Sequence, residues 1–282
     1  MDSRRFPPWL KRKLAYEGRH GEVAGLLADS GLHTVCAEAK CPNRGECFSK
    51  GGAAFLILGP ICTRNCAFCG VTSGTPSPVD VNEGERLAEA AAKMGLKHVV
   101  VTSVTRDDLP DGGAGAFADA VSKLRDKIPA ATIEVLIPDF RGSIDSLKTV
   151  LESAPNVLNH NMETVSRLYP QIRPQADYAR SLELIKRAAD DGRSVVKSGI
   201  MAGLGETADE VYELMRDLRT AGCGVITVGQ YLRPSAEQIP VSEFITPEQF
   251  AEYEKMAINI GFNRAFCGPY VRSSYRAEEL IS

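Results

Sequence analysis

A regular alternation of strand-like and helix-like segments constrains the fold of this chain more than any other feature of its sequence. Residues 98–104 (HVVVTSV) are rich in β-branched side chains, which is typical of a strand, and residues 114–127 carry apolar side chains at helical spacing. The same unit occurs six times. We predict strands at 54–58, 98–104, 132–137, 156–160, 194–201 and 225–232, each followed by a helix, at 81–94, 114–127, 143–152, 178–189, 207–218 and 246–260.

Strands that alternate with amphipathic helices form parallel sheets through right-handed crossovers. Two architectures fit this pattern: a doubly wound open sheet and a partial relative of the eight-unit TIM barrel. We expect the second, an α/β fold with a partial (β/α)6 TIM-like barrel over residues 53–262, between an N-terminal extension (1–52) and a C-terminal extension (263–282). In both architectures ligands bind at the carboxyl ends of the strands, so polar residues there are candidate site residues.

The composition is that of an ordinary globular protein, with 44% hydrophobic and 24% charged residues among 282. A chain of this length buries enough apolar surface to fold, which excludes extensive disorder. The longest apolar run, residues 53–62, is interrupted by Gly59 and Pro60 and is shorter than the ~20 residues that cross a bilayer. Since the N-terminus also lacks the apolar segment of a secretory signal, we expect a cytoplasmic protein without membrane contact.

The charge balance excludes a general nucleic-acid-binding protein. The 33 basic and 36 acidic residues give a formal net charge of −3, whereas proteins that bind nucleic acid carry a basic excess. One basic cluster lies near the N-terminus and comprises Arg4, Arg5, Lys11, Arg12, Lys13 and Arg19. It is either a solvated surface or a docking patch for an acidic partner protein.

Six of the eight cysteines lie between residues 36 and 69, and in a reducing cytoplasm such a cluster indicates metal binding or catalysis before disulfides. Cys62, Cys66 and Cys69 follow the first predicted strand with the spacing C-x3-C-x2-C, and Phe68 precedes the last cysteine. Three thiolates on one loop can hold three irons of a [4Fe–4S] cluster and leave the fourth iron open. The spacing matches the signature of radical S-adenosylmethionine (SAM) enzymes, and structural zinc is the alternative.

A second cysteine triplet, Cys36, Cys41 and Cys47, lies upstream with the spacing C-x4-C-x5-C. Alone it fits a zinc site in which His33 supplies the fourth ligand. Beside a radical SAM motif it also fits a second iron–sulfur cluster, whose fourth ligand then comes from elsewhere in the chain. We interpret the remaining cysteines, at 223 and 267, as small core residues.

Further motifs extend over nearly the whole chain. They lie at residues 31–36, 57–62, 102–109, 111–113, 159–163, 197–206, 229–232 and 272–275, the last of which reads Arg-Ser-Ser-Tyr (RSSY). Together with the two cysteine triplets, these segments resemble the lipoyl synthase family. The combination of the upstream triplet with the C-terminal RSSY sequence is specific, because other radical SAM families share only the C-x3-C-x2-C spacing.

The resemblance implies an auxiliary [4Fe–4S] cluster held by Cys36, Cys41, Cys47 and a serine of the RSSY sequence, so that the two extensions hold this cluster together. We expect the serine to be Ser274, with Ser273 as the alternative. A serine oxygen is a harder ligand for iron than a thiolate, which suits a cluster that must be opened. In the remaining interpretation, both serines merely cap a turn.

The resemblance also implies residues that bind SAM. Thr102 and Ser103 lie at a strand end where the family contacts the methionine part of SAM, and Phe68 lies where an aromatic ring packs near adenine. Further candidates at or just beyond strand ends are Asn159, Glu163, Arg173, Lys197 and Gln230. Each of these polar residues alone can equally be hydrogen-bonded within the fold. We expect His98 in the core and His160 just behind the site.

The implied activity is lipoyl synthesis, the insertion of two sulfur atoms at C6 and C8 of an octanoyl group attached to a lysine of a carrier protein. Two SAM molecules supply 5′-deoxyadenosyl radicals through the cluster at Cys62, Cys66 and Cys69, and the sacrificial auxiliary cluster supplies sulfur. The implied partners are octanoylated carriers (the glycine-cleavage H protein and the lipoyl domains of 2-oxoacid dehydrogenases), a low-potential electron donor such as ferredoxin or flavodoxin, and cluster repair proteins. The alternatives are a protein that only relays electrons and another sulfur-inserting radical SAM enzyme.

Overall fold

The computed structural model describes residues 6–11 and 18–281. Arg4, Arg5, Arg12 and Lys13 of the basic cluster lie outside the described residues, so the docking patch stays a prediction. In the described part of the chain the main sheet has eight strands, in the order β1-β2-β5-β6-β7-β8-β9-β10. They are β1 (His33–Thr34), β2 (Ala54–Ile57), β5 (His98–Ser103), β6 (Thr132–Leu136), β7 (Val157–Asn159), β8 (Val195–Ala202), β9 (Val225–Gln230) and β10 (Arg264–Gly268).

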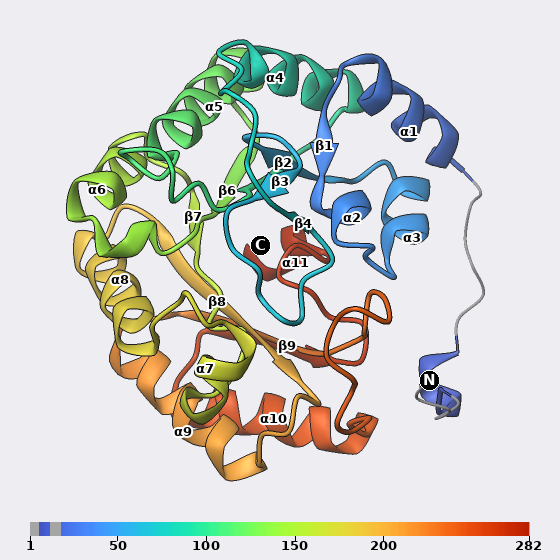
Figure 1. Ribbon diagram of the computed structural model, residues 1–282, viewed down its shortest axis with the longest axis vertical. Helices are drawn as coiled ribbons and strands as arrows, with labels where there is room; N and C mark the ends of the chain where they lie inside the picture. The colour runs from blue at the N-terminus through green and yellow to red at the C-terminus, as the bar shows by residue number, and fades with distance from the viewer. Residues whose placement is uncertain (1–5, 12–17, 282) are drawn as a thin grey trace.

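The strand order identifies a partial barrel. Neighbouring strands in the sheet follow one another along the chain, without the reversal at the centre of a doubly wound sheet. All pairs are parallel except β1 with β2. Figure 1 shows the strands on the inside of an arc and the connecting helices around its outside. These helices are α4 (Glu83–Met94), α5 (Ala114–Lys127), α6 (Ile144–Glu152), α8 (Tyr178–Asp191), α9 (Ala208–Thr220) and α10 (Pro247–Ile260). The predicted TIM-like architecture is confirmed.

The outer helices form where the sequence pattern places them. In α4, Leu87 and Met94 are buried on the inner face, and Gly95 ends the helix in the left-handed conformation (φ 71°), which glycine adopts without strain. Helix α9 begins with a reciprocal capping box between Thr207 and Glu210. Local signals in the sequence therefore fix both the faces and the ends of these helices.

The sheet extends beyond the six predicted strands. β10 is a further parallel strand, paired with β9 from Arg264 opposite Val225 to Gly268 opposite Gly229. We expected this segment in the C-terminal extension, because RAFCG has only three apolar residues between polar or glycine ends. At the other edge, β1 from the N-terminal extension pairs antiparallel with β2. Parts of both extensions thus complete the sheet.

The C-terminal tail (residues 269–281) turns back into the interior of the barrel. Figure 1 shows its last element, α11 (Ala277–Ile281), at the centre of the arc, and α11 contacts β5 and β10. A Cβ atom on Gly199 would lie 2.6 Å from Ser273 Oγ, and one on Gly229 would overlap the main chain of the tail. The main chain of the tail therefore requires glycine at position 229, whereas a side chain at position 199 would have to displace neighbouring side chains.

In the N-terminal extension, the described residues form the 3-10 helix η1 (Pro8–Leu10) and the α-helices α1 (His20–Asp29), α2 (Val35–Glu38) and α3 (Arg44–Ser49). α1 packs against α3 and α4, and α2 contacts β1 and β2. The second cysteine triplet lies on α2, on α3 and between them, so it is carried at the β1–β2 edge of the barrel. Among the described residues, none of the helices combines the length and apolar character needed to cross a membrane.

Candidate functional site

The first cysteine triplet lies on the loop that follows β2, at the carboxyl ends of the parallel strands. The sulfur of Cys62 accepts hydrogen bonds from the backbone N–H groups of Arg64 (3.4 Å) and Thr105 (3.3 Å). The hydrogen bond from Thr105 attaches the cysteine loop to the segment that follows β5. The backbone N–H of Ala67 donates to the carbonyl of Ile172 (2.9 Å), so the loop is also attached to the opposite side of the barrel mouth.

A buried ion-pair network fixes the segment between the first two cysteines of this loop. The Arg64 guanidinium donates to both oxygens of Asp107 (2.7 and 2.9 Å) and to Asp139 (2.7 Å). The side chains of Arg64 and Asp139 are 4% and 0% exposed. Burial opposes ionisation of Asp139, but the hydrogen bond and charge of Arg64 outweigh it and hold the pKa of this carboxyl well below its usual value. The cysteine loop is thereby anchored to the segments that follow β5 and β6.

The sulfurs of this loop lie close enough for their charges to interact. Burial raises the pKa of Cys66 and raises that of Cys69 to about 12, and the neighbouring thiols add to both shifts. Three sulfurs on one loop match the donor set of an iron–sulfur cluster, which binds them as thiolates. In the described part of the chain, no three His, Cys, Asp or Glu side chains are grouped as ligands of a single metal ion.

Three buried polar atoms around the barrel mouth have no hydrogen-bond partner among the described residues: Ser103 Oγ, Asn159 Oδ1 and Arg173 Nε. Ser103 and Asn159 are the last residues of β5 and β7. Arg173 follows α7 (Tyr169–Ile172), and its positive charge acts on the Cys66 thiol. Because buried polar groups are nearly always paired, these atoms indicate a polar ligand. All three residues are among the predicted SAM contacts, and the site fits a ligand with amino, carboxylate and hydroxyl groups.

Other predicted SAM contacts already have partners within the fold. Thr102 donates to the carbonyl of Leu136 (2.9 Å). The side-chain amide of Gln230 donates to the carbonyl of Ala202 (3.1 Å), and its oxygen accepts from the N–H of Ile245 (2.7 Å). Their contact with SAM stays a prediction. So does that of Phe68, which is half-buried on the cysteine loop and packs against the core.

The two remaining charged candidates differ in their surroundings. Glu163 accepts a hydrogen bond from Asn161 (3.1 Å), and burial raises its pKa. Its backbone is left-handed (φ 65°), a strained conformation for a residue with a side chain. Lys197 instead forms an ion pair with Glu134 (2.9 Å), and both side chains are 0% exposed. Glu163 therefore faces the barrel mouth with Arg173, whereas Lys197 lies inside the barrel.

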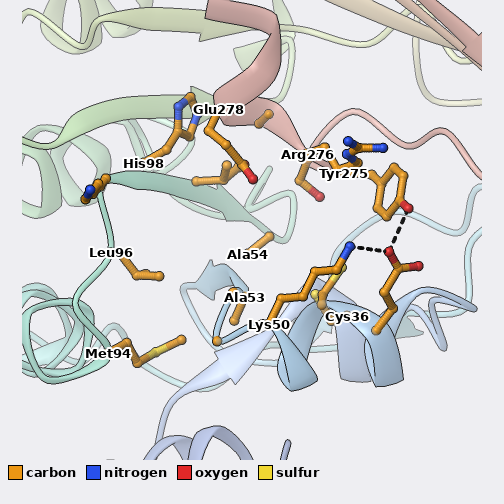
Figure 2. Close-up of a pocket in the computed structure, with 18 of the residues that line it drawn as sticks. Cys36, Lys50, Ala53, Ala54, Met94, Leu96, His98, Tyr275, Arg276 and Glu278 are labelled. Carbon is orange, nitrogen blue, oxygen red and sulfur yellow. Dashed lines mark hydrogen bonds and ion pairs between the residues drawn. The ribbon is translucent and has the colours of Figure 1, made fainter. Parts of the chain in front are cut away.

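A cavity of about 330 Å³ brings the second cysteine triplet and the C-terminal tail together. Cys36, Cys47 and Ser274 all line it, and Figure 2 shows Cys36 and Tyr275 on segments from the two ends of the chain. Burial raises the pKa of Cys36 and of Cys47 to about 12, and the charge of Cys41 adds to the shift in both. Cys41 is therefore close to the other two sulfurs.

The two serines of the tail have different surroundings. The hydroxyl of Ser273 donates to Asn161 Oδ1 (2.8 Å), and its carbonyl accepts from Lys197 Nζ (2.6 Å). Ser274 lines the cavity instead. This placement supports Ser274 over Ser273 as a ligand facing the second triplet.

A short polar chain joins the tail to α3. The hydroxyl of Tyr275 donates to Glu46 (3.0 Å), which also accepts from Lys50 (2.7 Å), as the dashed lines of Figure 2 show. Glu46 directly precedes Cys47 on α3, and Tyr275 directly follows Ser274. The bond between these neighbours therefore sets how close Ser274 lies to the second triplet.

The two candidate sites lie toward opposite ends of the barrel. The first triplet follows the carboxyl end of β2, whereas the cavity is lined by Ala54 and His98, the first residues of β2 and β5. The interior of the barrel thus separates the two sites along the strand direction. His33, the alternative zinc ligand, is paired with Glu38 (2.9 Å) and is not part of the cavity lining.

Sequence reasoning missed the charged residues that support both sites. The position of Arg64 between two cysteines could have identified it, and so could the position of Asp139 after a predicted strand. Glu134 lies inside a predicted strand, where nothing in the sequence gives it a partner. His98 is 6% exposed and pairs with Glu134, and Cys223 is fully buried, as expected for both.

Comparison with known proteins assigns the class. A family profile described as the radical SAM superfamily matches residues 56–218. Two solved structures share the fold at low identity. Methylornithine synthase has a TM-score of 0.53 at 15% identity, over 92% of this chain and 85% of that one. A maturase of the [FeFe]-hydrogenase has a TM-score of 0.60 at 17% identity, over 93% and 66%. The site and the profile together define a radical SAM enzyme, with a [4Fe–4S] cluster and SAM as cofactors.

Curated relatives narrow this class to one family. The lipoyl synthase of Caldanaerobacter subterraneus subsp. tengcongensis is 53% identical over 279 residues, which cover 99% of this chain and 98% of the relative. That of Thiobacillus denitrificans is 52% identical over 281 residues, covering 99% and 90%. The chain belongs to the lipoyl synthase family, as the sequence motifs indicated. A structural zinc site at the first triplet does not fit this family.

Proposed function

We propose that this enzyme inserts two sulfur atoms, at C6 and C8, into an octanoyl group attached to a lysine of a carrier protein. In this proposal Cys36, Cys41, Cys47 and Ser274 hold a sacrificial auxiliary [4Fe–4S] cluster that is the source of the sulfur. The observation that supports this proposal is that Cys36, Cys47 and Ser274 line the same cavity. These residues come from the two ends of the chain, and a SAM-cleaving barrel alone does not require them to meet.

SAM and the cluster of the first triplet, when bound, supply a 5′-deoxyadenosyl radical, which removes hydrogen from unactivated carbon where no side chain can. The chain's own residues prepare this site. Cys62, Cys66 and Cys69 leave one iron of a four-iron cluster without a protein ligand. The unpaired polar atoms of Asn159 and Arg173 then offer hydrogen bonds to the charged groups of SAM.

Ser274 has a different task in the proposal. If Ser274 holds one iron of the auxiliary cluster, its oxygen would bind that iron less firmly than the thiolates of the three cysteines would bind theirs. The bond between Tyr275 and Glu46 keeps the tail on α3 and thus keeps Ser274 facing the cysteines.

The partners follow from this chemistry. We propose as substrates the octanoylated glycine-cleavage H protein and the lipoyl domains of 2-oxoacid dehydrogenases, with two SAM molecules used for each product. A low-potential donor such as ferredoxin or flavodoxin supplies electrons, and repair proteins restore the auxiliary cluster. The eight free cysteines support action in the reducing cytoplasm.

The test compares two matched triple variants after anaerobic reconstitution. Replacing Cys36, Cys41 and Cys47 with Ala should leave 5′-deoxyadenosine formation intact but give no lipoyl product on an octanoyl-lysyl peptide, as measured by mass spectrometry. Replacing Cys62, Cys66 and Cys69 should abolish both. The unmodified chain should contain about eight irons, the content of two four-iron clusters. About four irons, or lipoyl product from the first variant, would refute the sulfur-donor role.

A further inference from the structure

An ion pair is buried in the middle of the barrel, away from both cysteine triplets. Glu134 on β6 and Lys197 on β8 are 2.9 Å apart, and both side chains are 0% exposed. Removing two charges from water is unfavourable, and in an apolar interior their attraction only partly offsets it. A contribution to the stability of the barrel therefore does not explain why this ion pair is buried there.

Further hydrogen bonds connect this pair to the cavity. Glu134 is 3.1 Å from His98 Nε2 and accepts from Asn159 Nδ2 (3.2 Å). His98 itself lines the cavity that contains Cys36 and Ser274. Burial opposes ionisation of Glu134, but the charge of Lys197 and the bonds from His98 and Lys197 outweigh it, so its pKa lies below the usual value. Glu134 is thus a carboxylate that anchors Lys197.

The ammonium group of Lys197 points to the main chain of the tail. It donates to the carbonyl oxygen of Ser273 at 2.6 Å. That carbonyl belongs to the peptide group that joins Ser273 to Ser274, so the direction of this hydrogen bond also orients the N–H and the Cα of Ser274. Gly199, two residues along β8 from Lys197, leaves the space that the tail occupies.

We propose that the Glu134–Lys197 pair is a positioning device that holds the Ser273–Ser274 peptide so that the Ser274 hydroxyl faces Cys36 and Cys47. The proposal rests on the assignment of Ser274 as a ligand of the auxiliary cluster. It assigns to Lys197 a main-chain contact in the tail in place of a contact with SAM. Glu134 is needed because a lone ammonium at this depth would be an unpaired buried charge.

The decisive variant removes both charges at once. Losing one partner of a buried pair destabilises a fold strongly, whereas replacing both with apolar residues of similar volume is often neutral. Glu134→Met with Lys197→Met should therefore be less harmful to the fold than either single change, although it also removes the hydrogen-bond partner of His98 and Asn159. The thermal unfolding midpoint of the double variant is measured to check that the fold is retained. Iron loss is measured in a parent chain that has only the auxiliary cluster, because Cys62, Cys66 and Cys69 are replaced by Ala. With the double substitution added, this cluster should lose iron to a chelator at least about 10-fold faster than in the parent chain. Its Mössbauer spectrum should also lose the distinct oxygen-ligated iron, and hydrogen exchange should increase over residues 270–278.

Ser273→Ala is the matched control. It removes the hydroxyl bonded to Asn161 and keeps the carbonyl bonded to Lys197, so iron loss should stay near that of the parent chain. If the double methionine variant does not fold, Glu134→Gln with Lys197→Gln is measured in its place. That pair keeps polar groups in the strands but is too short to reach Ser273, and it should show the same loss.

Failure of the proposed function and failure of the positioning role would give different results. If the parent chain with only the second triplet assembles no cluster, the proposed function fails whatever Lys197 does. If it assembles one, and the double variant retains that cluster with the parent's rate of iron loss and the parent's spectrum, the auxiliary cluster stands and the positioning role of the pair is overturned.

Discussion

Single hydrogen bonds determine which residue of the tail faces which site. The carbonyl and hydroxyl of Ser273 are taken by Lys197 and Asn161, and this leaves Ser274 at the cavity. Adjacent side chains in a turn point in different directions, so the fixed orientation of one serine determines that of the other. The barrel, and not the tail itself, therefore determines that Ser273 and Ser274 have different surroundings.

A pair of substitutions at Ser274 tests the ligand role. Ser274→Ala should leave one iron of the auxiliary cluster without a protein ligand, so the cluster should be lost faster on exposure to a chelator. Ser274→Cys should keep the cluster and slow sulfur insertion, because thiolate binds iron more firmly than a serine oxygen. Iron content and the yield of lipoyl peptide are the measurements. Normal values for Ser274→Ala with losses for Ser273→Ala would move the ligand to Ser273.

His160 predicts a pH dependence of stability. Burial, followed by the charge of Arg173, lowers its pKa to about 4, and its ring bonds Ile137 (2.9 Å) and Ser181 (3.0 Å) in the neutral form. In the unfolded chain histidine titrates near 6.5, so the unfolded state binds the proton first. Stability is then full above pH 6.5 and falls as pH decreases toward 4, by about 3 kcal/mol in total.

An NMR titration of isotope-labelled histidine checks this directly. The His160 ring resonance, identified by its absence in His160→Asn, should keep its neutral position down to about pH 5, one pH unit above the folded-state value. Asparagine places its amide N–H where the histidine Nδ1–H lies, so the bond to Ile137 can persist in the variant. A midpoint near 6.5 in the folded protein would contradict the assignment of a neutral, fully bonded ring.

At the residue scale, the sequence alone predicts which residues are candidate ligands better than it predicts the hydrogen-bond partners of the residues in the site. Cys36, Cys41 and Cys47 were found from spacing, and the RSSY sequence was found from resemblance. The choice between Ser273 and Ser274 depends on main-chain direction, which no local pattern encodes. Lys197 was expected to bind SAM because it was placed among the polar residues at or just beyond strand ends. Its partner Glu134 is 63 positions away in the chain, and the pair becomes visible only when β6 and β8 come together.

Among the elements, the cysteine loop after β2 depends most on its neighbours. It is short, and Arg64 holds it to Asp107 and Asp139, which follow two different strands. Removing one partner of a buried ion pair leaves the other charge uncompensated. The loop is therefore as rigid as the strand ends to which it is bonded.

Asp139→Asn should weaken this loop and the whole fold. We expect a loss of about 3 kcal/mol in the free energy of unfolding, since Arg64 and Arg180 both lose a buried anionic partner. In a chain that keeps only the first triplet, iron should be released faster and 5′-deoxyadenosine formation should decrease. Thermal unfolding and iron release are the measurements, and the exposed Asp126→Asn serves as the control. Equal behaviour of the two variants would contradict the anchoring role.

At the element scale, periodic patterns predicted all six strand–helix units. β10 was missed because its three apolar residues show no period, and it is specified by pairing with β9. β1 has two residues and exists only through its bonds to β2. Short edge strands of this kind are defined by tertiary contacts, which a single sequence does not display.

Across the whole molecule, the barrel and the tail behave as separable parts. The sheet from β1 to β10 is complete without the residues that follow Gly268, and the first triplet lies at the opposite end of the barrel from the cavity. A chain ending at Gly268 should therefore fold and form 5′-deoxyadenosine, but hold only one cluster. A chain ending at Arg276, which keeps Ser274 and the bond from Tyr275 to Glu46, should retain the second cluster better.

Iron content and 5′-deoxyadenosine formation, measured on both truncated chains, check this separation. Equal iron in the two chains would show that the tail contributes nothing to the second cluster. Loss of SAM cleavage in the shorter chain alone would show that the tail also supports the first site, and the two parts would then not be separable.

Because β1 and β10 do not pair with each other, the strands of the described residues form no closed ring around the tail. A tail inside a closed barrel could leave only by passing its end through the ring or by breaking the wall. Here its release requires that bonds such as those to Lys197, Asn161 and Glu46, and those that join Tyr270 to Leu10 and Asn43, be broken. Every pair of neighbouring strands in the sheet can stay intact. If the auxiliary cluster is used up in each reaction cycle, as we propose, the cavity could thus be reloaded from the side, and the same folded molecule could serve for more than one round.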